Sequence, residues 1–195
     1  NPLCIASVLR LSLRYANTQT LEEGYAINLL PLATFAMETY DADACTTYLP
    51  KIEDPTRRPD EKRCSLLAQM HKAVSVLQFK LECAAYHAHP EWNMLDRALL
   101  EHIDFATGEC LIGDRRYALC DTDFPTVDPQ HPAILTQGEE ELMRSLCHSF
   151  RISQHLQQHV EQLLQHGSIY GIYNSNLLFH ASVPMNADGT FRSVH

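Results

Sequence analysis

The sequence predicts a mainly α fold with small β-hairpins, in the α+β class. Apolar residues recur every three or four positions over most of the chain, which is the spacing of one helix face. Short β-branched and aromatic runs flank turn residues in only two places, near 109–119 and from 168 onward. The 195 residues suffice for one good-sized domain or two small ones, and we expect a helical domain over 1–167 and a β-hairpin over 168–195.

The first forty residues predict two helices. Residues 2–16 begin with Pro2, which suits the first turn of a helix. The expected apolar stripe of this helix consists of Leu3, Val8, Leu9, Leu11 and Tyr15. Residues 20–25 predict one short turn, and residues 28–40 predict a second helix entered through Pro31.

Residues 60–88 give the strongest helical pattern. The apolar positions expected to face the core are Leu66, Met70, Val74, Leu77, Leu81 and Ala84. The preceding residues 51–59 hold prolines and arginines without apolar periodicity, so we expect a surface loop there. Pro90 ends the helix, and a shorter helix is expected over 94–103.

The next segments alternate between turns and helices. Gly113 fits a type II′ turn in a hairpin over 109–119, and residues 121–129 predict a proline-punctuated loop. Thr136 and Glu139 have the spacing of a capping box at the start of a helix. The apolar phase of this helix slips near Ser153, where we expect a break, and Gly167 is expected to end it in the left-handed conformation.

The last 28 residues form the second predicted hairpin. Two apolar runs flank Ser175–Asn176, which we expect to be the turn. An isolated hairpin is marginal in water, so it needs the helices behind it or a sheet from elsewhere. Its exposed edges favour strand swapping or a homo-oligomer.

Composition excludes several function classes. A formal net charge of −9 disfavours binding to nucleic acid or to an anionic membrane surface. Seven cysteines, an odd number without a CxxC pair, argue against a disulfide framework or a thiolate zinc site. Together with the lack of a signal peptide, they lead us to expect a cytoplasmic protein whose cysteines are mostly buried as small apolar residues.

Two short motifs suggest chemistry only weakly. The segment HLQQH, 155–159, places two histidines one helical turn apart, but Leu156 stands where a zincin has its general base. We interpret it as a solvated polar face. The segment GDRR, 113–116, is better explained as the turn of the hairpin than as a metal or phosphate site.

Three residues are the candidates for a functional site. Arg10 and Arg14 lie one turn apart on the same side of the first helix, so an anion should be near them. Glu22, Glu23 or another carboxylate could supply that charge, and a phosphate group gripped by the guanidinium groups is the alternative. His180 ends an apolar strand beside small residues, which suits either a satisfied core histidine or a rigidly held metal ligand.

Four segments, met in order along the chain, resemble the class III fructose-1,6-bisphosphatases of bacteria. They are GYAINLLPLATFA (24–36), NMLDRALL (93–100), DTDFPTVDP (121–129) and YNSNLLFHASVPMNADG (173–189). That family looks like a member of the calcineurin-like metallophosphoesterases, which have an α/β/β/α sandwich fold. The resemblance implies that our chain is the helical insertion of such a sandwich, plus the hairpin returning to its active-site sheet.

The same resemblance implies an activity and a metal site. The activity would be hydrolysis of the 1-phosphate of fructose 1,6-bisphosphate in gluconeogenesis, with two divalent metals, Mn²⁺ or Mg²⁺, bridged by a hydroxide. His180 matches the lone histidine ligand of the family, whereas Ala181 and Ser182 replace a Gly-Cys pair. Arg10 and Arg14 would be the first residues to test as substrate contacts.

The remaining ligand blocks of the family, among them G-D-x-x-D-R-G and G-N-H-D, have no match here, and the chain opens on Asn1 rather than Met. We therefore expect an excised middle segment without a catalytic residue of its own, inactive alone and unable to hold metal tightly. The alternative is a non-catalytic helical module whose apolar stripes bind a partner protein.

Overall fold

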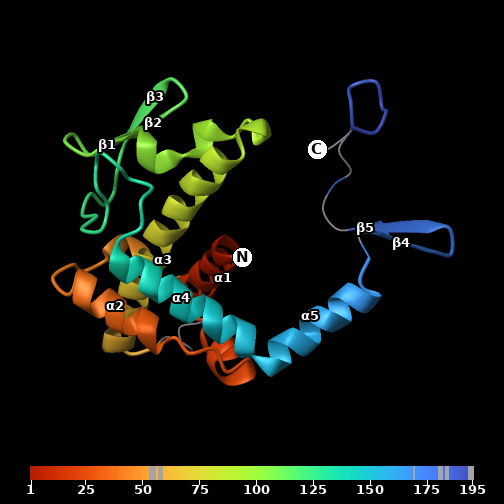
Figure 1. Ribbon diagram of the computed structural model, residues 1–195, viewed down its shortest axis with the longest axis horizontal. Coiled ribbons are helices and arrows are strands. Elements are labelled where there is room, and N and C mark those ends of the chain that lie inside the picture. The colour runs from red at the N-terminus through yellow and green to blue at the C-terminus, as the bar shows by residue number, and fades with distance from the viewer. Residues whose placement is uncertain (53–55, 57–58, 169, 180–181, 183–184, 193–195) are drawn as a thin grey trace. The chain divides into compact units, whose positions relative to one another are not determined.

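The computed structural model describes residues 1–52, 56, 59–168, 170–179, 182 and 185–192. The chain forms two units, Asn1–His155 and Leu156–His195. Helices predominate, with a few small antiparallel strand pairs, which confirms the predicted mainly α class (Figure 1). The division into domains 1–167 and 168–195 stays a prediction.

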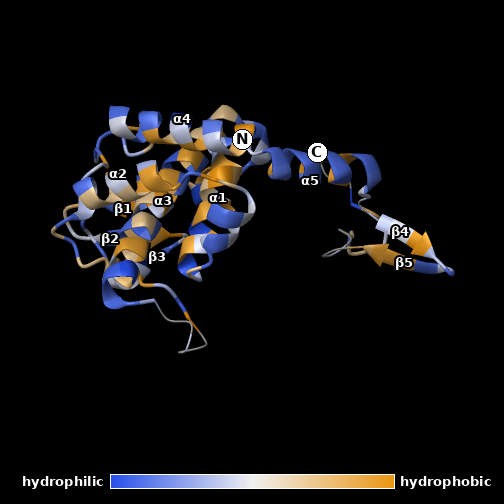
Figure 2. Cartoon of the chain, turned by 90° about the horizontal axis from the view of Figure 1, so that it is seen from below, coloured by the Kyte–Doolittle hydropathy of each residue, from blue (hydrophilic) through white to orange (hydrophobic). Residues whose placement is uncertain are grey.

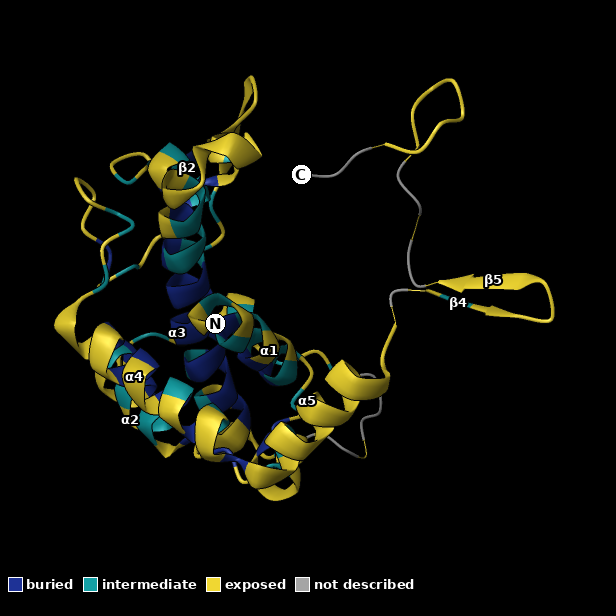
Figure 3. Ribbon diagram, turned by 45° about the vertical axis from the view of Figure 1, so that its right-hand side comes forward, coloured by how far each residue is buried: buried dark blue, intermediate teal, exposed yellow. Residues whose placement is uncertain are grey.

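The first unit is built around α3 (Glu61–Ala88). The carboxylate of Asp60 accepts a hydrogen bond from the backbone N–H of Arg63 at 2.8 Å and so caps its first turn. Figure 3 shows the middle of α3 buried on all sides, with α1 (Pro2–Arg14) and α4 (Gln137–Ile152) near it. Together with α2 (Leu30–Tyr40), these helices cover α3, which explains why it buries polar as well as apolar positions.

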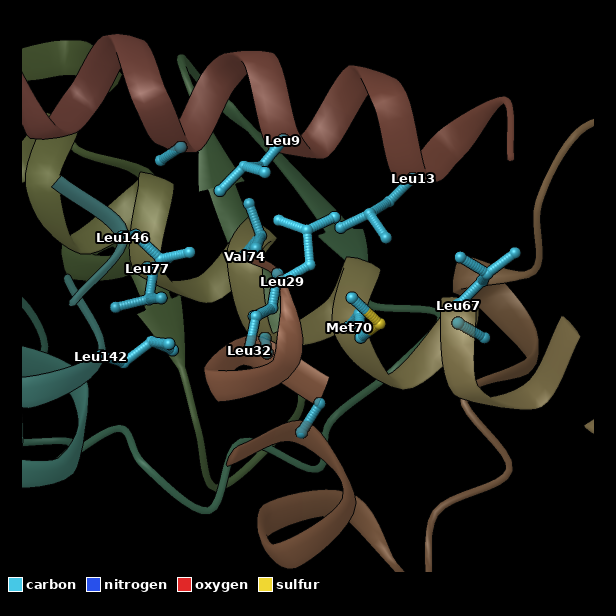
Figure 4. Packing of buried hydrophobic residues seen from close by; sticks show 14 of the residues in the cluster. Leu9, Leu13, Leu29, Leu32, Leu67, Met70, Val74, Leu77, Leu142 and Leu146 are labelled. Atoms are coloured by element: carbon cyan, nitrogen blue, oxygen red, sulfur yellow. The ribbon is translucent and has the colours of Figure 1, made fainter. Parts of the chain in front are cut away.

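One hydrophobic cluster joins the four helices. Leu9 and Leu13 point from α1 into this cluster (Figure 4). It also contains Leu32 of α2, Leu77 of α3 and Leu146 of α4, all fully buried. Burying side chains of this size contributes about 1.5–3 kcal/mol each, so the cluster is the main stabilising feature of the unit.

Two of the predicted apolar stripes need correction. On α1 the buried residues are Ala6, Leu9 and Leu13, whereas Val8, Leu11 and Tyr15 are exposed. Leu9 of the predicted stripe is confirmed, but the α1 sequence is apolar on two opposite sides and its spacing does not show which side packs against the core. On α3 the predicted core positions from Met70 to Leu77 are confirmed, but Ala84 is exposed because the helix leaves the bundle there.

The predicted helix over 94–103 is wrong. The structure has three short 3₁₀ turns instead, at Pro90–Trp92, Leu95–Arg97 and Leu99–His102. Ala98, with φ of −72° and ψ of 63°, leaves the helical conformation between the last two of these turns, so no continuous helix spans 94–103. The repeated turning brings Ala98 and Leu100 against Cys83 of α3 in a second, smaller core.

The predicted hairpin over 109–119 is confirmed and gains a third strand. The antiparallel order is β1 (Ile103–Asp104), β2 (Glu109–Ile112) and β3 (Arg115–Ala118). Gly113 has φ of 58°, as the first central residue of a type II′ turn requires. The GDRR segment is therefore the turn of this sheet and the start of β3.

The break between the last two helices is also confirmed. The capping box of Thr136 and Glu139 opens α4, and Ser153 separates it from α5 (Gln154–His166). The Ser153 hydroxyl donates a hydrogen bond to the carbonyl of Tyr25 at 2.5 Å. Gly167 does not adopt the predicted positive φ; glycine is needed because a Cβ there would lie 2.3 Å from the carbonyl oxygen of Leu163.

The second unit holds a hairpin of β4 (Tyr170–Tyr173) and β5 (Asn176–Phe179). Its turn is Asn174–Ser175, both at positive φ, one residue before the predicted turn. Figure 2 shows apolar residues along both strands, and their large side chains are exposed. Among the helices of the described residues, none is long and apolar enough to cross a bilayer.

Candidate functional site

Lys72 is a fully buried cation in the middle of α3. Its Nζ lies 2.7 Å from Oδ2 of Asp121 and donates a second hydrogen bond to Asp43. Burial acts to lower the pKa of Lys72, but the hydrogen bonds to the two carboxylates outweigh it and raise that pKa above its ordinary value. Lys72 is therefore charged at neutral pH and joins two loops to the central helix.

Aromatic rings surround the same ammonium group. The ring centroids lie 5.1 Å (Tyr40), 5.9 Å (Tyr48) and 5.6 Å (Phe124) from Nζ. Cation–π attraction at these distances contributes about 0.5–2 kcal/mol each in a desolvated site. Burial, then the nearby charge of Asp121, raises the pKa of Tyr48 to about 12, so this phenol stays neutral.

The Asp43–Lys72 pair predicts a specific sensitivity to acid. Burial acts to raise the pKa of the Asp43 carboxyl, but hydrogen bonds from Lys72 and the backbone N–H of Cys45 hold it below the ordinary value. The stabilisation is complete above that ordinary value of 3.8 and is lost as pH falls through the lower folded pKa. Asp43→Asn should be less stable at neutral pH and should flatten the fall of unfolding free energy below about pH 4.

Urea unfolding of the unchanged chain and of Asp43→Asn at several pH values measures how steeply the unfolding free energy falls in acid. Asp41→Asn is the matched control, because Asp41 is exposed two residues away. An Asp43→Asn protein with the same acid slope as the unchanged chain would contradict the assignment.

Lys80 is a second buried cation, two turns further along α3. Its Nζ donates to the carbonyl oxygens of Thr126 (2.6 Å) and Ile134 (3.0 Å). It also lies 2.7 Å from Oε2 of Glu139, the carboxylate that accepts the N–H of Thr136 in the capping box. One lysine thus fixes the loop before α4 and the first turn of α4 to the central helix.

Neither lysine was predictable as a buried group from the sequence, because lysine in a helix ordinarily faces water. One signal was available: Asp121, the partner of Lys72, opens the segment DTDFPTVDP, which the sequence predicts to be a proline-punctuated loop and which resembles the bisphosphatase family. That segment also supplies the carbonyl of Thr126 to Lys80 and the buried side chain of Val127. The loop is rigid because two buried cations hold it.

A cavity of about 260 Å³ lies beside the Lys72 cluster. Its walls are mostly apolar and come from α3, the three-stranded sheet and the segment 119–124, with Asp121 and Tyr48 at its edge. Such a lining holds no cationic side chain to bind a phosphate. We assign the cavity to packing rather than to catalysis.

Three of the four buried cysteines of this unit have thiols with a raised pKa. Burial, then the charge of Asp43, raises the pKa of Cys45 to about 12. Burial likewise raises the pKa of Cys83 and of Cys110. Thiols with raised pKa carry almost no thiolate at neutral pH, so these three behave as small apolar residues.

The structure places the two candidate arginines on one flank of α1, half-buried. Among the described residues, neither forms an ion pair: Glu22 pairs with Arg63 at 3.5 Å, and Glu23 accepts a hydrogen bond from Gln19. Neither Glu22 nor Glu23 is therefore the partner of Arg10 and Arg14, and the alternative of another carboxylate stays a prediction.

His180, the candidate metal ligand, lies outside the described residues. Within the described part of the chain, no group of three His, Cys, Asp or Glu side chains is placed to hold a metal ion. In the HLQQH segment, Nδ1 of His155 lies 3.2 Å from the carbonyl oxygen of Gly24. The described residues thus do not by themselves make the two-metal site that the resemblance implies.

Comparison with known proteins matches the whole chain. The family model described as Firmicute fructose-1,6-bisphosphatase matches residues 1–195. The chain is 50% identical over 194 residues to the class 3 fructose-1,6-bisphosphatase of Parabacteroides distasonis, covering all of this chain and 29% of that protein. It is 50% identical over the same length to that of Bacteroides thetaiotaomicron, again covering 29% of the relative.

A third relative gives a similar result. The class 3 fructose-1,6-bisphosphatase of Clostridium novyi is 47% identical over 191 residues, which cover 98% of this chain and 28% of that protein. No solved structure matches the chain. The match over every residue favours the enzyme family over a separate interaction module, and the chain belongs to the Firmicute fructose-1,6-bisphosphatase family.

Proposed function

We propose that this chain is the middle segment of a longer enzyme that hydrolyses the 1-phosphate of fructose 1,6-bisphosphate, giving fructose 6-phosphate and phosphate. The observation that carries the proposal is the family match over residues 1–195, whereas the chain spans only 29% of the length of its relatives. We place the reaction in gluconeogenesis and the enzyme in the cytoplasm.

The first unit would serve as a helical insertion beside the catalytic part. Its four helices share one core, and its buried lysines tie the long loops to α3, so it has the contacts of an independently folded body. The β4–β5 hairpin has no such core, because its large apolar side chains are exposed. A hairpin of this kind needs a further sheet to cover it, which supports the proposal that it joins the active-site sheet.

The metal of the longer enzyme would be Mn²⁺ or Mg²⁺, and His180 would contribute one neutral imidazole nitrogen to it. A divalent metal supplies Lewis-acid stabilisation of a transferring phosphoryl group. The described residues offer no ligand set of their own, so the other ligands would come from elsewhere in the longer protein. This chain alone should bind metal weakly and should lack activity.

Growth of a bacterial strain without fructose bisphosphatase, on a carbon source that requires gluconeogenesis, tests the proposal. The complete open reading frame containing these residues should restore growth, and residues 1–195 alone should not. Failure of the complete reading frame, although the protein is expressed and soluble, would contradict the proposed activity.

A further inference from the structure

Arg10 and Arg14 form a pair of positive charges that meets no carboxylate among the described residues. They lie one turn apart on α1, whose residues 2–14 include no Asp or Glu. No ion pair of either arginine exists within the part of the chain that the structure describes, and Nε of Arg14 is buried without a hydrogen-bond partner. Two like charges at this spacing repel each other, and a buried unpaired N–H costs about 1–3 kcal/mol.

A histidine lies on α3, the helix that packs against α1 through the shared hydrophobic cluster. His71 of α3 is 7% exposed, and its Nδ1 lies 2.9 Å from the carbonyl oxygen of Tyr48. Because a carbonyl only accepts, Nδ1 carries the hydrogen, and Nε2 is left as an acceptor that becomes a donor on protonation. Nε2 has no hydrogen-bond partner among the described residues.

Electrostatics connects the three side chains. Burial is the main reason that the pKa of His71 is lowered; the Tyr48 carbonyl opposes this, and the charges of Arg10 and Arg14 lower the pKa further. The charges of these two arginines therefore reach the imidazole. An anion bound to the two arginines would offset their charges and so raise the pKa of His71. The protonated imidazole would then donate a hydrogen bond to that anion.

We propose that Arg10, Arg14 and His71 form a binding site for a phosphate monoester group. Guanidinium groups suit this ligand because each donates two parallel hydrogen bonds to phosphate oxygens, and a third donor at His71 would complete the grip. The site lies on the helical unit and needs no metal. Binding at this site does not require the proposed phosphatase activity.

Calorimetric titration of residues 1–195 with inorganic phosphate, and separately with sulfate, tests the site. Arg10→Gln and Arg14→Gln should each weaken phosphate binding about tenfold, and the double variant about a hundredfold. Arg14→Lys should recover only part of the loss, since lysine lacks the planar fork. The matched control R144Q/R151Q removes the same charge from exposed positions of α4 and should bind normally.

His71 supplies a readout that a purely structural role would not give. The pKa of His71 can be measured by NMR in a pH titration. Sulfate stays a dianion across the pH range of this titration, and saturating the chain with sulfate should raise that pKa. By linkage, sulfate should bind more tightly as pH falls through that pKa. Among the described residues, the charges that act on His71 are those of Arg10 and Arg14, and Tyr48 presents its carbonyl and its ring, which lies 5.5 Å from the imidazole. The double arginine variant should therefore abolish this pH dependence.

Two results would overturn the proposal. One is phosphate binding by R10Q/R14Q equal to that of the unchanged chain. The other is absence of phosphate binding to the unchanged chain.

Kinetics of the longer enzyme would then identify the source of the phosphate group. If it belongs to the substrate, R10Q/R14Q raises KM for fructose 1,6-bisphosphate, and kcat changes little. If it belongs to a separate phosphorylated ligand, KM is unchanged and the response of the enzyme to that ligand is lost. A double variant identical to the unchanged enzyme in both respects would contradict a functional anion site.

Discussion

Replacing Lys80 by alanine should lower the unfolding free energy of this chain by about 3–5 kcal/mol. The substitution leaves Glu139, which is 1% exposed, as a buried carboxylate without its cation. It also removes the donor from the carbonyls of Thr126 and Ile134. Urea unfolding followed by helical circular dichroism gives the change directly.

Two comparisons distinguish the effect of breaking the buried Lys80–Glu139 ion pair from the effect of removing any lysine from α3. Lys62→Ala, at an exposed position of the same helix, should change stability by less than about 0.5 kcal/mol. The double variant K80M/E139Q should be more stable than K80M, because it removes the stranded charge while glutamine keeps the capping box. A cost below about 1 kcal/mol for Lys80→Ala would show that the loop before α4 does not depend on this lysine.

Replacing His180 by alanine in the longer enzyme should reduce hydrolysis of fructose 1,6-bisphosphate by at least about a hundredfold. Removal of a metal ligand loses more than the roughly 10–100-fold effect of changing a residue that only supports one. The bound metal per polypeptide should fall in parallel, as measured by elemental analysis.

The control for this change is His166→Ala, which removes an exposed histidine from the end of α5. It should keep both metal and activity. A fully active, fully metallated His180→Ala enzyme would return His180 to the interpretation of a satisfied strand-end histidine.

The elements with strong local signals were predictable from sequence. Asp60 caps α3, the Thr136–Glu139 box opens α4, and Gly113 sets the turn between β2 and β3. Each depends on contacts within a few residues, so the pattern contains the information. The helix expected over 94–103 failed because contacts with Cys83 on α3 govern that segment rather than its own periodicity.

The buried charges could not be predicted in the same way. Lys72 meets Asp43 and Asp121, and Lys80 meets Glu139, across separations that only the tertiary fold closes. α1 shows the same limit for apolar residues, since two of its faces are apolar and packing decides which one is covered. The candidate metal ligand was inferred from family resemblance, because a lone histidine after a strand has no spacing pattern to identify its partners.

The most direct test of the account is the rate of phosphate release from fructose 1,6-bisphosphate by the complete purified protein and by residues 1–195 alone. We expect the complete protein to release phosphate, to form fructose 6-phosphate, and to lose this activity when a chelator removes its divalent metal. We expect no release by residues 1–195. A complete, folded and metal-loaded protein without this activity, or full activity of residues 1–195 alone, would contradict the account.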